Sequence, residues 1–469
     1  MATSSTLSSL GVGSGLDVNS IITGLMAIEK KPLTNLQTAE KTINTQISEV
    51  GKIKSALSKF RDLAAKLAGT DFWKQTTGTS GSPAVGITTD GNATTGNYSV
   101  QVSALASAQA IATGTYASSS ALVGAGTLTI ESGTWGANQA SFTSGGAATA
   151  VTITADDTLA SVRDKINTSG AAVTASILTD ASGARLVIRS KDTGAANAFR
   201  TSVSAGGPTG LAYDPSSGVS NATRSQTAAN AAATINGIAV SSASNSLVNV
   251  LDGVTLTLKD LTTSAANVTV ASDTDAMKKT LQDFAAAYTD LAKLIATDTK
   301  YDATSKSAGP LQGDGAVVGL QTRLRAMLGA TSGASSAYAR LSDAGFEMQR
   351  DGSLSVNATK LDKALANLPE LKKLMSNSSS TDASLDGFGK RFRVFASDVL
   401  GVEGTLTARS DGLAEKLKRN QASQDSMQQR LDQVQKRLEA QYTALDAQMG
   451  KLNSLSSYVT QQVAAWNKA

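Results

Sequence analysis

Side chains that commonly carry catalysis are scarce in this sequence. Its 469 residues include no cysteine and no histidine, which excludes thiolate nucleophiles, imidazole bases and metal sites built on these side chains. The adjacent carboxylates of Asp156 and Asp157 could form an acid–base pair or bind a metal ion. Because Asp157 stands just before a short apolar-periodic run over 159–166, we expect it to cap a helix instead. Serine–lysine or carboxylate pairs assembled from distant segments stay open, since spacing alone cannot exclude them.

Nucleotide and ester chemistry also lacks its usual motifs. Gly11, Gly13 and Gly15 form a glycine cluster, but no strand precedes it, as a dinucleotide-binding loop would require. The sequence contains neither a P-loop nor a Gly-x-Ser-x-Gly elbow. We therefore predict a protein that is not an enzyme, with no catalytic residues, no cofactor and no metal ion. Its function should lie in its interaction surfaces.

The charge and hydropathy patterns argue against two further classes of partner. The formal net charge is +4, and lysine and arginine form no basic run interleaved with aromatic residues, so we predict no nucleic-acid binding. No window of about 18 residues is uninterruptedly apolar, so we predict no membrane insertion. Residues 1–16 contain no lysine, no arginine and no apolar core. They are unlike a Sec-type signal peptide, and we expect a disordered tail there.

A heptad pattern in residues 17–74 predicts the first structural element. Asp17 precedes an apolar-periodic run and can cap its helix, with Asn19 and Ser20 as alternative caps. Pro32 lacks a backbone donor and should divide the helix near Lys31. Apolar residues then recur every seven positions, which is typical of a coiled coil. These seam positions are Leu36, Ile43, Val50 and Leu57.

A longer seam, with alternating spacings of four and three residues, runs through 406–469. A helix of 50 residues would extend roughly 75 Å, so this segment should project from a compact domain. Its apolar seam positions are Leu417, Met427, Leu431, Val434, Leu438, Leu445, Leu452, Leu455 and Val459. Its polar seam positions are Asn420, Gln424, Gln441, Gln448 and Gln462. Because buried amides often specify register or oligomeric state, the seam could pack antiparallel on the N-terminal helix, against other chains, or both.

Between these helices the periodicity changes to two, as in 98–102 and 254–258, which predicts strands. A hairpin turn is expected at 180–183. We predict a multidomain α+β fold, with long terminal helices forming coiled-coil legs and antiparallel β-rich head domains inserted between them. The expected parts are a leg over 17–74, an inner head over 75–112 and 229–273, an outer head over 113–228, a mixed helical segment over 274–405 and the C-terminal helix over 406–469.

Four groups of short motifs follow one another in a specific order. They are Gly13-Ser14-Gly15-Leu16-Asp17 followed by Ile21-Ile22, Gly96-x-Tyr98-x-Val100-x-Val102, Ile235-Asn236-Gly237 and Gly309-Pro310-Leu311. In this order and spacing they resemble the flagellar filament cap proteins, also called hook-associated protein 2. The resemblance extends over 13–74, 96–110, 230–365 and 440–462, about half of the chain. Residues 111–229 match least, although Ile166-Asn167 and Arg185-Leu186-Val187-Ile188 resemble a module common in flagellar axial proteins.

The resemblance implies a secreted cap at the distal tip of the bacterial flagellar filament. Head domains would form a plate, and the terminal helices would reach the outermost flagellin subunits. The chain would assemble into a ring-shaped homo-oligomer, in the first place a pentamer, that retains exported flagellin and promotes its folding and polymerisation, filament elongation and motility. Export would use the flagellar type III apparatus without a cleaved Sec signal, and an export chaperone would bind 431–463.

Two other functions stay open. A surface adhesin would bind host glycan or mucin through the β-rich head, a role that some caps also serve. A hook–filament junction protein or a flagellin would share the terminal heptads, but would lack the Gly309-Pro310-Leu311 and Asn236-Gly237 blocks. For a cap, the apolar seam positions of both helices are the expected oligomer and partner contacts. The amide-rich C-terminal helix is the expected partner-facing leg.

Overall fold

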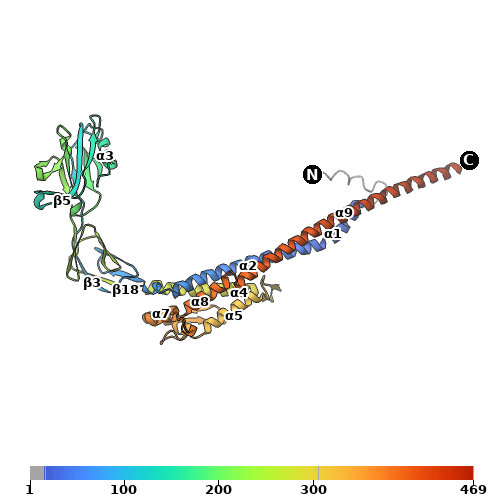
Figure 1. Cartoon of the computed structure of the whole chain (residues 1–469). Helices are drawn as coiled ribbons and strands as arrows, with labels where there is room; N and C mark the ends of the chain where they lie inside the picture. The colour runs from blue at the N-terminus through green and yellow to red at the C-terminus, as the bar shows by residue number, and fades with distance from the viewer. Residues whose placement is uncertain (1–14, 16, 305, 468–469) are drawn as a thin grey trace. The chain divides into compact units, whose positions relative to one another are not determined.

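The computed structural model describes residue 15 and residues 17–304 and 306–467. These residues form two compact units: a helical unit, made of the segments up to Trp73 and from Asp275 onward, and a β unit, Lys74–Thr274. Figure 1 shows the long helices of the first unit and the sheets of the second. The predicted α+β class, with long terminal helices and β-rich domains inserted between them, is confirmed. The tail expected over 1–16 lies, except for Gly15, outside the described residues.

The helical unit is built mainly from long α-helices. Its helices are α1 (Val18–Glu29), α2 (Lys31–Ala68), η2 (Asp71–Lys74), α4 (Thr274–Thr299), α5 (Gly315–Gly329), η7 (Leu341–Ala344), α6 (Ala358–Ala366), α7 (Leu368–Ser376), η8 (Ala383–Leu385), α8 (Phe388–Leu400) and α9 (Thr405–Trp466). Two short hairpins complete it, β19 (Tyr301–Asp302) with β20 (Ser307–Ala308) and β21 (Phe346–Met348) with β22 (Leu354–Val356).

Local sequence explains where the first helices begin and divide. The carboxylate of Asp17 accepts hydrogen bonds from the backbone N–H of Ser20 at 3.0 Å and from its hydroxyl at 2.7 Å, so it caps α1 as predicted. Pro32 lies in the first turn of α2, where its missing N–H costs no helical bond. The predicted division near Lys31 is therefore confirmed, with Lys30 between the two helices.

The core of the helical unit centres on packed aromatic rings. The Phe60 ring of α2 lies 4.9 Å from that of Phe284, 5.2 Å from Phe392 and 5.9 Å from Tyr288, measured between centroids. All four side chains are fully buried. Aromatic pairs of this kind contribute about 0.5–1.5 kcal/mol beyond the area that they bury. The cluster joins α2, α4 and α8, which are far apart in sequence, into one body.

The β unit contains antiparallel strand pairs throughout its described residues. Its strands are β1 (Thr76–Ser80), β2 (Val85–Thr89), β3 (Gly96–Ala104), β4 (Ala110–Ala112), β5 (Gly126–Trp135), β6 (Phe142–Ser144), β7 (Thr149–Ile153), β8 (Val173–Asp180), β9 (Gly183–Ser190), β10 (Ala198–Val203), β11 (Tyr213–Asp214), β12 (Val219–Ser220), β13 (Thr223–Gln226), β14 (Ala231–Ile235), β15 (Ile238–Ser242), β16 (Ser246–Leu251), β17 (Val254–Leu258) and β18 (Ala266–Ser272). Short helices α3 (Leu159–Thr168), η3 (Ala137–Gln139), η4 (Ala195–Asn197), η5 (Thr209–Leu211) and η6 (Pro215–Ser217) connect some of them.

Two hydrophobic cores divide these strands into two sets. The sheets β1-β18-β3-β14-β15 and β16-β17-β2 enclose one core, and the sheets β12-β11-β10-β5-β6 and β13-β4-β9-β8 enclose the other, with β7 on β5. The second set is inserted between β3 and β14. Strand β4, which the expected boundary at 112 assigns to the inner head, pairs with β9 of this second set. We therefore propose a boundary at the bridge between Ser107 and Ala229.

The cap expected for the short helix α3 is wrong by one residue. Thr158, not Asp157, accepts the hydrogen bond from the backbone N–H of Ser161, at 3.2 Å. Asp157 instead pairs with Lys165 and accepts from the Thr154 backbone and the Ser161 hydroxyl. These bonds, the one from Lys165 first, lower its carboxyl pKa. The carboxylate thus holds α3 to the turn that follows β7, since it binds Ser161 and Lys165 of α3 and Thr154, the residue directly after that strand.

Candidate functional site

The heptad residues of α2 face the core of the chain itself. Ile43, Val50 and Leu57 are at most 2% exposed and belong to the core of the helical unit. Leu36 is half-buried. In the single chain the first three side chains have no surface left for a partner, so their packing is intramolecular. The heptad pattern predicted that these positions are apolar and buried. It did not predict which part of the chain covers them.

Helices α2 and α9 pack antiparallel, and polar bonds define their register. Lys54 donates to the Thr407 hydroxyl at 3.3 Å, near the start of α9. Further along, the Glu40 carboxylate accepts from Gln424 at 2.7 Å and from Gln421 at 3.2 Å. These bonds, the one from Gln424 first, lower the pKa of Glu40. Of the packing arrangements left open for the C-terminal seam, the antiparallel one on the N-terminal helix is therefore present, and Gln424 is paired within the chain.

A small apolar cluster holds α1 on α9. Val18, Ile22 and Met26 of α1 and Leu431 of α9 are buried there together. Partly buried side chains surround them, namely Leu33, Met427, Val434, Leu438 and Tyr442. Nearer the start of α9, the predicted seam residue Leu417 is half-buried against the core of the helical unit. The seam from Leu417 to Leu438 therefore packs at least partly inside the chain.

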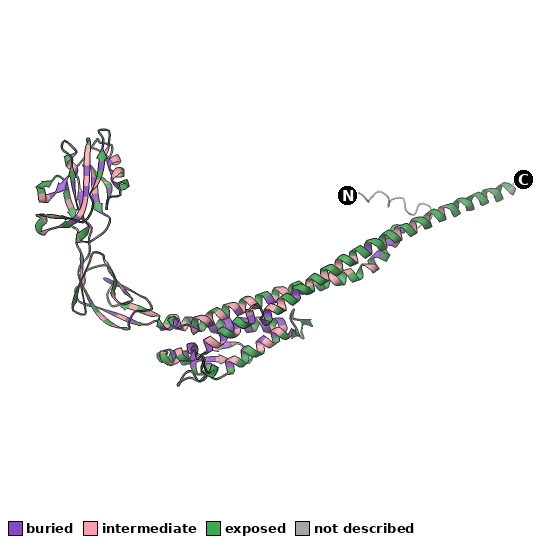
Figure 2. Cartoon of the chain, viewed as in Figure 1, coloured by how far each residue is buried: buried purple, intermediate pink, exposed green. Residues whose placement is uncertain are grey.

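The same seam becomes exposed beyond Tyr442. Leu445 is 41% exposed, Leu452 and Leu455 are each 58% exposed and Val459 is 52% exposed. With the equally open Tyr458 and Val463, these residues form what we call the uncovered face of α9. Figure 2 shows this end of the helix as exposed along its length. Residues 452–467 contain no Asp, Glu, Lys or Arg, so from Leu452 onward this part of the helix is uncharged.

An unpaired apolar face of this kind indicates an interaction site. Contiguous exposed apolar surface often marks a site of contact with another protein, a membrane or a ligand, and an amphipathic helix commonly docks by its apolar face. Gln441 and Gln448 of the seam lie exposed next to it, and Gln462 donates only to the Tyr458 hydroxyl, at 3.4 Å. Four of the predicted contact residues thus differ from the buried ones: Leu445, Leu452, Leu455 and Val459 are exposed, whereas Leu431 is buried.

The described residues show no alternative centre for metal or membrane chemistry. Among residues 15, 17–304 and 306–467, no group of three or more acidic side chains could hold a metal ion. Within the same ranges, no helix is both long and apolar enough to cross a membrane.

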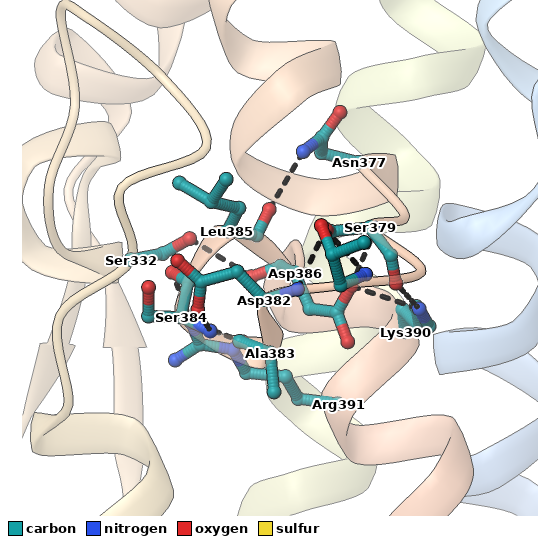
Figure 3. Close-up of polar contacts among 11 residues, drawn as sticks. Ser332, Asn377, Ser379, Asp382, Ala383, Ser384, Leu385, Asp386, Lys390 and Arg391 are labelled. Atoms are coloured by element: carbon teal, nitrogen blue, oxygen red, sulfur yellow. Dashed lines mark hydrogen bonds and ion pairs between the residues drawn. The ribbon is translucent and has the colours of Figure 1, made fainter.

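The polar cluster around Asp386, drawn in Figure 3, illustrates how acidic groups are used instead. Its carboxylate accepts from the Ser379 backbone and from Lys390, both at 2.8 Å. Its backbone carbonyl accepts from the Ser332 hydroxyl at 2.8 Å. Arg391 donates to the carbonyls of Ala383 and Ser384. These bonds close the loop between α7 and α8, so we assign the cluster a structural role.

Comparison with known proteins connects this architecture to one family. The family models "Flagellar hook-associated protein 2 N-terminus" and "Flagellar hook-associated protein 2 C-terminus" match residues 14–109 and 228–454. The flagellar hook-associated protein 2 of Escherichia coli K12 is 33% identical over 97% of this chain and 98% of its own length. The chain belongs to the flagellar hook-associated protein 2 family. The resemblance predicted from the motifs is confirmed.

A second relative and a solved structure agree with this membership. The A-type flagellar hook-associated protein 2 of Pseudomonas aeruginosa is 29% identical over 99% of this chain and 98% of its own length. The crystal structure of the flagellar cap protein FliD D1-D2-D3 domains from E. coli matches with a TM-score of 0.61 at 30% identity, covering 78% of this chain and 99% of that one. A hook-associated cap family is structural, which agrees with the prediction of a non-enzyme.

The module suspected within the least similar segment also has a match. A family model described as "Flagellin hook IN motif" covers residues 127–192. Ile166 is fully buried, and the Asn167 side chain both accepts from the Ala175 N–H at 2.7 Å and donates to its carbonyl at 2.9 Å. The Ile-Asn pair therefore joins α3 to β8 through one core contact and two hydrogen bonds.

Proposed function

We propose that this chain caps the distal tip of the flagellar filament, outside the cell. The observation that carries the proposal is the uncovered face of α9, an apolar helix surface on a member of the hook-associated protein 2 family. Flagellin subunits arriving at the tip would be retained there, fold and polymerise. The protein would thereby support filament elongation and motility without catalysing a reaction.

The working form proposed is a ring-shaped homo-oligomer, in the first place a pentamer. Burial of Leu452, Leu455 and Val459 requires a second surface, since nothing described in the chain covers them. We propose that these side chains dock on the outermost flagellin subunits. Burying a leucine or valine side chain contributes about 1.5–3 kcal/mol. A few such contacts would hold a cap on the filament and still let it move outward as each flagellin subunit is added.

Export would precede docking, and the same helix would serve both stages. We propose passage through the flagellar type III apparatus without a cleaved Sec signal, with an export chaperone bound to 431–463. The chaperone would cover the uncovered face before secretion and release it afterwards. A chain ending at Tyr442 should then fail to co-purify with the chaperone from export-blocked cells, whereas the full chain retains it.

A deletion strain tests the capping function directly. Loss of the protein should leave short or absent filaments and release flagellin into the medium, as measured by microscopy and by immunoblotting of cell-free medium. Complementation with a chain carrying Leu452→Ser and Leu455→Ser should restore filament elongation poorly, because serine weakens the apolar contact. Gln461→Ser, an exposed polar change on the same helix, should restore it fully. Normal filaments without the protein would refute the proposal.

Adhesion remains a second prediction. It requires binding of labelled mucin to the full chain, measured in the absence of flagellin. Filament assembly and mucin binding are separate readouts, so either function can fail without the other.

A further inference from the structure

A polar cavity in the β unit has the composition of a small-ligand site. Its volume is about 470 Å³, within the range of roughly 300–1,000 Å³ typical of ligand pockets. It lies between the β5–β6 connection, η4 and the end of β13. The side chains that line it include Trp135, Asn138, Gln139, Arg224 and Thr227, and none of the lining residues is acidic.

Arg224 supplies a positive charge that the chain itself does not neutralise. Its side chain is half-buried, and among the described residues it forms no ion pair or hydrogen bond. The strand that carries it has a bulge between Arg224 and Gln226, and bulges redirect side chains near functional sites. Arg200, by contrast, is paired with both Glu131 and Asp214. A guanidinium is suited to bind a carboxylate through two parallel hydrogen bonds.

The aromatic wall of the cavity is held rigid from behind. The Trp135 indole N–H donates to the side-chain oxygen of the fully buried Gln109 at 2.9 Å, and Gln109 in turn donates to the Phe199 carbonyl at 2.6 Å. The Trp135 ring also meets Tyr213 edge-on at 6.0 Å. Gln139 donates to the Tyr213 hydroxyl at 2.6 Å. This second layer orients the wall before any ligand binds.

The turn beside Trp135 holds its amides in an unusual backbone conformation. Asn138 and Gln139 both have left-handed φ angles, 52° and 61°. Left-handed residues other than glycine are strained, and they concentrate at functional sites. The Asn138 amide has no hydrogen bond with any described residue, so it is free to bind hydroxyl groups.

We propose that this cavity binds a carboxylated sugar. The carboxylate would pair with Arg224, the ring hydroxyls would bond to Asn138 and Thr227, and the apolar face of the ring would pack on Trp135. A neutral sugar would leave the guanidinium unpaired. A doubly charged phosphate would lack a second cation, since Arg224 is the one charged side chain among the described residues that line the cavity. The site is independent of the uncovered face of α9 and of the capping function.

The test uses D-glucuronate and D-glucose, which share a ring and differ in the carboxylate. Saturation-transfer NMR and calorimetry on the full chain should show glucuronate binding at least about 10-fold more tightly than glucose, because a hydrogen bond to a charged group contributes about 1.5–3 kcal/mol. Equal binding of both sugars, or no glucuronate binding, overturns the proposal. Binding of a glutamate-rich peptide in place of glucuronate also overturns it and would indicate a protein partner.

Three variants locate the binding within the chain. Arg224→Gln should weaken glucuronate binding about 10- to 100-fold and leave the weak glucose binding unchanged. Arg189→Gln removes the same charge from an exposed position on β9, away from the cavity, and should bind like the original chain. Arg224→Lys keeps the charge and should retain part of the affinity for glucuronate. This partial binding would show that the loss in Arg224→Gln comes from the missing charge and not from a folding defect. Unchanged binding by Arg224→Gln refutes the site.

Discussion

Individual side chains along one seam of α9 have different roles. Leu431 is 1% exposed and packs on α1, whereas Leu452 is 58% exposed. Both are leucines at equivalent heptad positions. The difference comes from what lies opposite each of them, and it can be tested one residue at a time.

Leu431→Ala should loosen α1 from α9. Removing a buried leucine side chain costs about 2–5 kcal/mol, with the low end expected here because the cluster is small. Amide hydrogen exchange over 18–29 should accelerate accordingly. Leu452→Ala is the matched control and should leave this exchange unchanged, within about 0.5 kcal/mol. Equal exchange in both variants would show that α1 is held by other contacts.

Glu370 should give the helical unit a measurable acid dependence. Hydrogen bonds from Lys373 first, then from Ser335 and Ser336, lower its pKa from 4.5 to about 2. A lowered folded-state pKa stabilises the fold above pH 4.5, and the contribution is lost as pH falls towards 2. Glu370→Gln should therefore unfold at lower urea than the original chain near neutral pH.

The difference in the urea concentration of unfolding between Glu370→Gln and the original chain should shrink as pH falls from 4.5 to 2. Glu415→Gln, which removes a carboxylate from an exposed part of α9, is the control and should unfold like the original chain near neutral pH. A Glu370→Gln deficit that persists at pH 2 would contradict the assigned ionisation.

At the scale of elements, α9 is one helix with two environments. From Thr405 to Tyr442 it packs on α8, α2 and α1, and beyond that the side chains of the uncovered face, Leu445 to Val463, are exposed. Helix continuity extends through both parts because no proline or helix end interrupts it. The first part should stabilise the fold and the second should bind partners.

A chain ending at Tyr442 separates these two roles. It should lose helical circular dichroism in proportion to the residues removed, yet unfold at nearly the same temperature, because the removed side chains bury little apolar surface. Its complementation of a deletion strain should fail. A large fall in melting temperature would instead show that the distal half stabilises the helical unit.

At the scale of the whole molecule, the proposed cap must form a closed assembly. A ring uses one repeated interface that closes, whereas a flagellin-like chain would extend into filaments. Purified full chain should therefore form discrete small rings in negative-stain images and a single oligomer mass in solution. Long filaments from the purified chain would contradict the cap proposal and favour a flagellin.

Sequence alone determined the features that depend on near neighbours. The caps and breaks around Asp17 and Pro32, the alternation of strands such as 98–102 and the heptads of α2 and α9 follow from periodicity and backbone chemistry within a few residues. The family motifs were likewise readable in order along the chain. They sufficed to predict the fold class and the family.

Only the tertiary structure decided which of the apolar helix faces are buried within the chain and which stay exposed. Gln424 bonds to Glu40, and Leu431 is buried in one cluster with Met26, because α9 packs against α2 and α1, a pairing that the seam pattern allowed but did not select. The cavity joining Trp135 to Arg224 likewise depends on the approach of separate strands. Burial and unpaired charge are properties of spatial neighbours, so identical heptad leucines can be core at 431 and free surface at 452.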